Sequence, residues 1–73
     1  MEEWTTEQVA QFVGSSTDEY LQFGEKAQVY AEQLMTQDVD GQTLLGLSEE
    51  DLTGLGFSLG HRRKLLAWIQ RWS

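Results

Sequence analysis

The side chains with the greatest chemical potential in this 73-residue chain form two neighbouring blocks of opposite charge. The first block supplies carboxylates: Asp38, Asp40, Glu49, Glu50 and Asp51. The second block begins with Leu59 and Gly60 and then supplies nitrogen donors: His61, Arg62, Arg63 and Lys64. Carboxylates and guanidinium groups form strong, often bidentate, charge-assisted hydrogen bonds. The two blocks therefore predict recognition between surfaces of opposite charge.

The same side chains form a poor catalytic set. The chain has one histidine and no cysteine, and it lacks a Ser-His-Asp order, a phosphate-binding loop and a dinucleotide fingerprint. A single histidine among scattered acids is also not the convergent cluster that a metal needs. We therefore predict no enzymatic activity, no cofactor, no metal and no small-molecule substrate.

Length and charge narrow the function classes further. A chain of 73 residues predicts a single domain. The net charge is −7, and all 12 acidic residues lie within residues 1–60, where Lys26 is the only base. This acidity disfavours nucleic-acid binding, which needs a broad basic face. No apolar run reaches the roughly 20 residues of a membrane span, and acids stand where a signal peptide has bases. We expect an intracellular protein, cytoplasmic or nuclear, that is not bound to a membrane.

Three helix starts show the same N-terminal signature. Thr5 fits an N-cap with Gln8 as its capping-box partner, and Trp4 and Val9 occupy the positions of a hydrophobic staple. Asp40 is the second predicted cap, with Val39 and Leu44 as the staple pair. Ser48 is the third, with Leu47 and Leu52 as the pair and Asp51 at the capping-box position. The two helices that begin at Asp40 and Ser48 are too short to be stable alone, so they must pack on a longer helix.

The longer helix follows at the C-terminal end. Ser58 is its predicted N-cap, and apolar residues recur at three- and four-residue steps: Leu65, Leu66, Trp68, Ile69 and Trp72. Trp4, Leu65, Trp68 and Ile69 are predicted core residues. The bases of this helix lie near its N-terminus, where the helix dipole disfavours cations. Such an arrangement suggests that the bases have another use.

The stretch between the first helix and residue 36 is harder to interpret. The first helix should end at Gly14 to Ser16. We then expect Thr17-Asp18-Glu19 to cap a short helical turn with Tyr20, Leu21 and Phe23, interrupted by Gly24. A further helix is predicted from about Lys26 to Thr36, with Ala27, Tyr30 and Leu34 facing inward.

Most of the charged residues also have a structural interpretation. Asp40 and Ser48 suit helix caps, and Asp51 suits capping and partner binding equally. Glu49 and Glu50 fit a solvated face as well as an interface. His61 fits a structural imidazole better than a pH-sensitive contact, whereas the arginines are the strongest candidates for partner binding.

Several motifs occur in an order that resembles the sterile alpha motif (SAM) domain family. They include Tyr30-x-x-x-Leu34, Val39-Asp40-Gly41, Leu55-Gly56 and Gly60-His61-Arg62-x-Lys64-Leu65-Leu66, and the opening Trp4-Thr5-x-x-x-Val9-x-x-Phe12-Val13 fits the first helix. The resemblance covers nearly the whole chain. It implies one all-α, compact five-helix bundle over residues 1–73, with short central helices packed on a longer C-terminal helix. The segment at about residues 14–26 is longer than is usual in that family.

The resemblance also implies a function in protein–protein interaction. SAM domains often associate head to tail through an acidic mid-loop surface and a basic end-helix surface. The mid-loop surface would here consist of Asp38, Asp40, Glu49, Glu50 and Asp51. The end-helix surface would consist of Leu59, Gly60, His61, Arg62, Arg63 and Lys64. We expect charge reversal at Arg62 or Arg63 to weaken assembly without unfolding the domain.

Two readings of the partner follow from this resemblance. The favoured one is a homo-oligomer or helical polymer, within a larger signalling or scaffold protein. The alternative is a monomeric domain that binds a different SAM domain or another protein. Binding of RNA or lipid through the basic turn is a weaker alternative, because the turn is flanked by acid.

Overall fold

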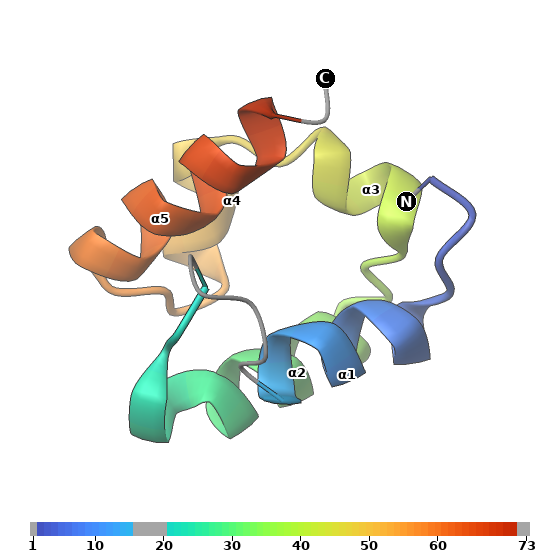
Figure 1. Ribbon diagram of the computed structural model, residues 1–73, viewed down its shortest axis with the longest axis horizontal. Coiled ribbons are helices and arrows are strands. Elements are labelled where there is room, and N and C mark those ends of the chain that lie inside the picture. The colour runs from blue at the N-terminus through green and yellow to red at the C-terminus, as the bar shows by residue number, and fades with distance from the viewer. Residues whose placement is uncertain (1, 16–20, 72–73) are drawn as a thin grey trace.

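The protein is seen in a computed structural model that describes residues 2–15 and 21–71. Over these residues the chain is helical and has no strand (Figure 1). Its elements are α1 (Thr6–Ser15), the 3₁₀-helix η1 (Gly24–Lys26), α2 (Ala27–Thr36), α3 (Gly41–Leu45), α4 (Glu49–Gly54) and α5 (Leu59–Gln70). The predicted all-α, five-helix class is confirmed.

The helices form two groups. The first two helices, α1 and α2, pack along each other in the lower half of Figure 1, and α3, α4 and α5 lie above them. The longest helix is α5, and both short central helices contact it. This arrangement agrees with the expectation that two-turn helices are held by a longer one.

The three predicted helix starts are present. The backbone N–H of Thr5 donates to Gln8 Oε1 at 2.9 Å, and that of Gln8 donates to Thr5 Oγ1 at 3.2 Å. The backbone N–H of Thr43 donates to Asp40 Oδ1 at 2.8 Å. Ser48 and Asp51 form a complete capping box. These bonds satisfy backbone N–H groups that have no partner within their own helix.

Two local predictions need correction. Leu21 and Phe23 are not in a helical turn: residues 21–23 are irregular and both side chains are buried in the core. Gly24 begins η1, with φ +60°, rather than interrupting a helix. Ser58 is the N-cap residue of α5 as predicted, although its hydroxyl makes no capping bond and lies 3.4 Å from the Tyr30 hydroxyl. The predicted cap at Thr17-Asp18-Glu19, and Tyr20 with it, lie outside the described residues.

The core takes side chains from all five helices. Leu65, Trp68 and Ile69 are buried as predicted, and so are Ala27, Tyr30 and Leu34 on α2. Trp4 is partly buried, with its ring centre 5.2 Å from that of Phe12. Trp72 lies outside the described residues. The rings of Tyr30 and Phe57 stack at 4.0 Å, and Phe23 meets both edge-on.

The same C-terminal turn ends both α2 and α4. After α4, Phe57 N–H donates to the Leu52 carbonyl and Gly56 N–H to the Thr53 carbonyl, with Gly56 at φ +89°. After α2, Val39 N–H donates to the Leu34 carbonyl and Asp38 N–H to the Met35 carbonyl, with Asp38 at φ +55°. Both turns are Schellman motifs, in which glycine is the preferred left-handed residue. Asp38 therefore occupies a position that suits glycine.

Candidate protein-interaction surfaces

Two of the five mid-loop residues, Glu50 and Asp51, line a groove at the junction of three helices. The groove has a volume of about 520 Å³ and is formed by the end of α2, α3 and α4. Its lining is apolar at Val39, Leu47 and Leu55, and acidic at Glu50 and Asp51. Asp38 is exposed beside this groove, between the lining residues Gln37 and Val39. The fold thus brings acids from two separate segments to one concavity.

The five acids of this surface differ in whether their carboxylates already accept hydrogen bonds within the domain. The carboxylates of Asp40 and Asp51 both accept hydrogen bonds from backbone N–H groups of their own turns. The hydrogen bond from Thr43 N–H lowers the pKa of Asp40 below its ordinary value of 3.8, since it favours the charged form. The carboxylates of Glu49 and Glu50 form no ion pair or hydrogen bond with the described residues. Glu50, which is exposed and lines the groove, is the acid best placed to meet a partner.

The end-helix surface has an exposed part at the start of α5. The Leu59 side chain is 55% exposed. A Cβ atom at Gly60 would meet nothing within 4 Å, so the backbone there is open to a neighbouring molecule. Arg63 and Lys64 are exposed and form no ion pair within the described part of the chain. These four residues can all reach a partner.

The other two residues of this surface, Arg62 and His61, are partly buried. Arg62 Nη1 donates to the Phe57 carbonyl at 3.0 Å, and the buried Arg62 Nε has no hydrogen-bond partner among the described residues. Charge reversal at Arg62 would therefore disturb the turn before α5 as well as the surface. Reversal without an effect on the fold therefore stays a prediction for the exposed Arg63, whereas the contacts of Arg62 argue against it there.

His61 is a structural residue in this fold. Its Nδ1 lies 2.6 Å from the Tyr30 hydroxyl, and its ring centre lies 5.1 Å from that of Phe23. Burial lowers the pKa of His61 below its ordinary value of 6.5, and the nearby Lys64 and Lys26 lower it further. The interpretation of His61 as a structural imidazole agrees with these contacts.

The acidic and basic surfaces come from different elements. Glu50 and Asp51 lie on α4, whereas the bases lie on α5, which packs against α4. Glu50 and the bases Arg63 and Lys64 form no ion pair with one another. Because the surfaces do not neutralise each other within one molecule, both remain available to other molecules.

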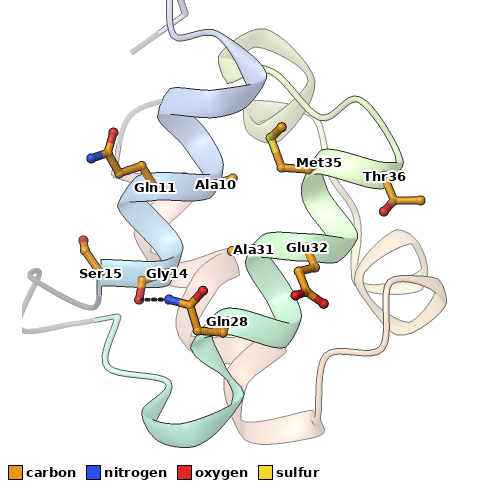
Figure 2. A pocket seen from close by; sticks show the side chains of 9 residues that line it. All are labelled: Ala10, Gln11, Gly14, Ser15, Gln28, Ala31, Glu32, Met35 and Thr36. Carbon is orange, nitrogen blue, oxygen red and sulfur yellow. Dashed lines mark hydrogen bonds between the residues drawn. The ribbon is translucent and has the colours of Figure 1, made fainter.

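A second groove, of about 660 Å³, lies between α1 and α2 and contains none of the predicted residues (Figure 2). Figure 2 shows the Gln28 side chain bonded to the Gly14 carbonyl, with Nε2 donating at 3.2 Å. The helices approach closely here, because a Cβ atom at Gly14 would lie 3.2 Å from that of Ala31. The sequence signal for this approach is the spacing of Ala10 and Gly14, four residues apart on one helix. Among the described residues that line this groove, Glu32 is the one that carries a charge.

The described residues contain neither a candidate metal site nor a membrane-spanning helix. Within residues 2–15 and 21–71, no group of three or more His, Cys, Asp or Glu side chains could hold a metal ion. In the same part of the chain, no helix has the length and apolar character needed to cross a membrane.

Comparison with known proteins agrees with the fold and the motifs. The profile of the family described as SAM domain (Sterile alpha motif) matches residues 1–72. Searches of curated proteins and of solved structures gave no match. Members of the matched family are generally interaction modules rather than enzymes. With its five-helix fold and a family match over nearly its full length, the chain belongs to the sterile alpha motif family of protein-interaction domains.

Proposed function

We propose that this SAM domain associates with itself head to tail, the end-helix surface of one copy docking into the mid-loop groove of the next. The observation that supports this most directly is that one molecule carries both an exposed leucine flanked by bases and a partly apolar groove lined by acids. Leu59 protrudes beside Gly60, Arg63 and Lys64. The groove offers an apolar floor with Glu50 and Asp51 in its lining.

Docking would stabilise the contact in two ways. Burying an exposed leucine side chain contributes up to about 1.5–3 kcal/mol, and less for Leu59 because it is already partly covered. The Ser58 hydroxyl makes no capping bond, so backbone N–H groups in the first turn of α5 are free to bind a carboxylate such as that of Glu50. Arg63 can add a bidentate pair.

Asp38 gives independent support. It holds a left-handed conformation at the C-terminal end of α2, where both the backbone and the helix dipole disfavour an aspartate. The corresponding position after α4 is Gly56. A charged residue kept at such a position is consistent with a role on the acidic surface.

The contact joins two different surfaces, so it is heterologous. Such contacts produce a closed ring if the rotation between copies closes, and an open helical filament if it does not. The ion pairs lie at the molecular surface, where added salt screens them. We expect association to weaken as salt concentration rises.

The test compares two charge reversals, one on each surface. Arg63→Glu and Glu50→Arg should each give a monomer, and an equimolar mixture should give a dimer through the one remaining intact pair of surfaces. Glu32→Arg is the matched control, because it changes the net charge as Glu50→Arg does but lies in the α1/α2 groove. Gly60→Asp adds an acid in the first turn of α5, which suits the helix dipole, yet it should also block docking.

The measurement is molar mass by light scattering during size-exclusion chromatography, over a range of protein and salt concentrations. The wild-type mass should rise above the 8.4 kDa of the monomer as concentration increases. A wild-type mass that stays at the monomer value, or single variants that assemble like the wild type, would overturn the proposal. A constant monomer mass would instead favour a different SAM domain or another protein as the partner.

A further inference from the structure

The hydroxyl of Tyr30 connects α2 to the start of α5 at two points. It accepts a hydrogen bond from the Ser58 backbone N–H at 3.3 Å and lies 2.6 Å from His61 Nδ1. The Tyr30 side chain is only 1% exposed, and its ring stacks on Phe57, so the hydroxyl has a fixed position. The first turn of α5 is therefore held by a buried group on another helix.

The two contacts lie on either side of the exposed docking residues. Ser58 precedes Leu59 and Gly60 in the sequence, and His61 follows them. Ser58 makes no capping bond of its own, and the Tyr30 hydroxyl contacts this turn on both sides of Leu59 and Gly60. We infer that Tyr30 positions the end-helix surface for docking, and that its hydrogen bond to His61 makes this positioning sensitive to protonation. This inference rests on the proposed head-to-tail association.

Donors and acceptors around the hydroxyl favour a neutral His61. The Ser58 N–H already donates to the Tyr30 oxygen, so the Tyr30 proton is free to be donated to His61 Nδ1. This requires an imidazole with its proton on Nε2. If Nδ1 also becomes protonated, it can only donate, and the Tyr30 proton must turn toward Ser58 Oγ at the longer distance of 3.4 Å.

The charges around the imidazole act in the same direction. Burial is the main cause of the lowered pKa of His61, and Lys64 on α5 and Lys26 at the end of η1 lower this pKa further. Arg62 is the adjacent cation, with its guanidinium bonded to the Phe57 carbonyl. Tyr30 is the titratable group that faces the ring from α2, and no carboxylate of the described residues contacts it. A protonated His61 would therefore be an added cation without a counterion.

Two effects of acidification oppose each other, which makes the inference testable. A positive charge on His61 adds to the basic surface and would by itself strengthen docking to an acidic groove. The same charge also reverses the Tyr30–His61 hydrogen bond, moves the Tyr30 proton to the longer contact with Ser58, and places a cation without a counterion near Lys64, which would loosen the first turn of α5 and weaken docking. If loosening of the first turn of α5 outweighs the added charge, association of the wild type should weaken when the pH is lowered from 7.5 to 5.5.

The experiment measures the association constant of Tyr30→Phe by sedimentation equilibrium at both pH values. The phenylalanine keeps the ring stacking on Phe57 and removes only the hydroxyl, so the domain should remain folded. At pH 7.5 we expect association about tenfold weaker than in the wild type, equivalent to about 1.4 kcal/mol. On acidification the association of Tyr30→Phe should stay level or rise, because only the charge effect remains.

Thr5→Ala is the matched control for general destabilisation. It breaks the capping box of α1 and should lower the stability of the domain without touching α5. Its association should equal that of the wild type at both pH values. Equal association of Tyr30→Phe and wild type at pH 7.5 would overturn the inference, and so would wild-type association that strengthens on acidification.

Nitrogen NMR of the His61 ring separates this inference from the proposed function. In the monomeric Glu50→Arg variant we expect an unprotonated Nδ1 at pH 7.5, and a His61 pKa that rises when Tyr30→Phe is added, because the hydroxyl stabilises the neutral ring. Wild type that never associates, together with this NMR result, would overturn head-to-tail assembly but leave the Tyr30–His61 contact established. A proton on Nδ1 at pH 7.5 would overturn the contact itself.

Discussion

Replacement of Asp38 by glycine should make the domain more stable and, at the same time, less able to associate. Asp38 is at φ +55° in the turn that ends α2, and the equivalent residue after α4 is Gly56 at φ +89°. A left-handed backbone costs a residue with a side chain about 1–2 kcal/mol. Glycine removes this cost but loses about 0.5–1 kcal/mol through its greater freedom in the unfolded chain.

The charge of Asp38 adds a smaller contribution. A carboxylate near the C-terminal end of a helix is disfavoured by about 0.3 kcal/mol when exposed, the lower end of the usual range. Together these effects predict that Asp38→Gly stabilises the fold by about 1 kcal/mol. For a domain of this size, that corresponds to a melting temperature about 4–8 °C higher.

The assay is thermal unfolding followed by circular dichroism, in the monomeric Arg63→Glu background. This background is needed because association would itself raise the melting temperature by mass action. Two further variants separate the causes: Asp38→Asn removes the charge and tolerates the left-handed backbone, whereas Asp38→Ala removes the charge and keeps the strain. The expected order of melting temperature is glycine, then asparagine, then the original aspartate, with alanine no higher than aspartate.

Association is measured separately, with Arg63 restored. All three variants remove the same charge, so all three should weaken assembly to a similar degree, including the more stable glycine variant. A glycine variant that melts at or below the aspartate form, or an alanine variant as stable as glycine, would refute the backbone reasoning. Unchanged assembly in all three would remove Asp38 from the interaction surface.

Three further predictions concern the fold. Ser48→Ala removes the capping box of α4 and should cost about 1 kcal/mol of unfolding free energy, measured in urea; no loss would mean that the box is not formed in solution. Gly14→Val forces α1 away from Ala31 and should lower the free energy of unfolding by about 1–3 kcal/mol, and Gly14→Ala should lower it by less. Equal stability of the wild type and both variants would contradict the close approach of α1 and α2. The pKa of His61 is lower in the folded state than in the unfolded chain, so the folded state binds fewer protons and stability should fall as pH drops through 6.5 toward that lower pKa. His61→Gln should flatten this dependence of stability on pH, measured by urea titrations at a series of fixed pH values. An unchanged slope in this variant would show that His61 is not the source of the pH dependence.

The helix starts were predictable because each depends on residues three positions apart. Thr5 with Gln8, and Ser48 with Asp51, form their bonds within one turn, so no distant contact is needed. The extent of α2 followed from its apolar spacing for the same reason. The prediction of a helical turn at Leu21 and Phe23 was wrong, because these side chains are buried in the core by contacts with other elements. A local pattern of apolar residues does not distinguish a buried irregular segment from a helical turn.

The candidate surfaces were predictable only in part. That an acidic block precedes a basic block is a property of residue order, and it was visible without a fold. Which bases face outward was not visible, because Arg62 and Arg63 are neighbours with the same chemistry. Arg62 bonds to the Phe57 carbonyl, whereas Arg63 is exposed, and this difference depends on how the turn before α5 meets the core.

Residue order alone thus accounts for the helical class, the three local caps and the separation of charge, because each arises within a few residues of the chain. Tertiary packing was needed to form the groove with Val39, Leu55 and Glu50, which come from separate elements. Packing was also needed to bring Tyr30 to His61, 31 positions later in the sequence. Contacts between such distant residues form only when the core closes, because burial of apolar surface offsets the entropy of holding those segments together.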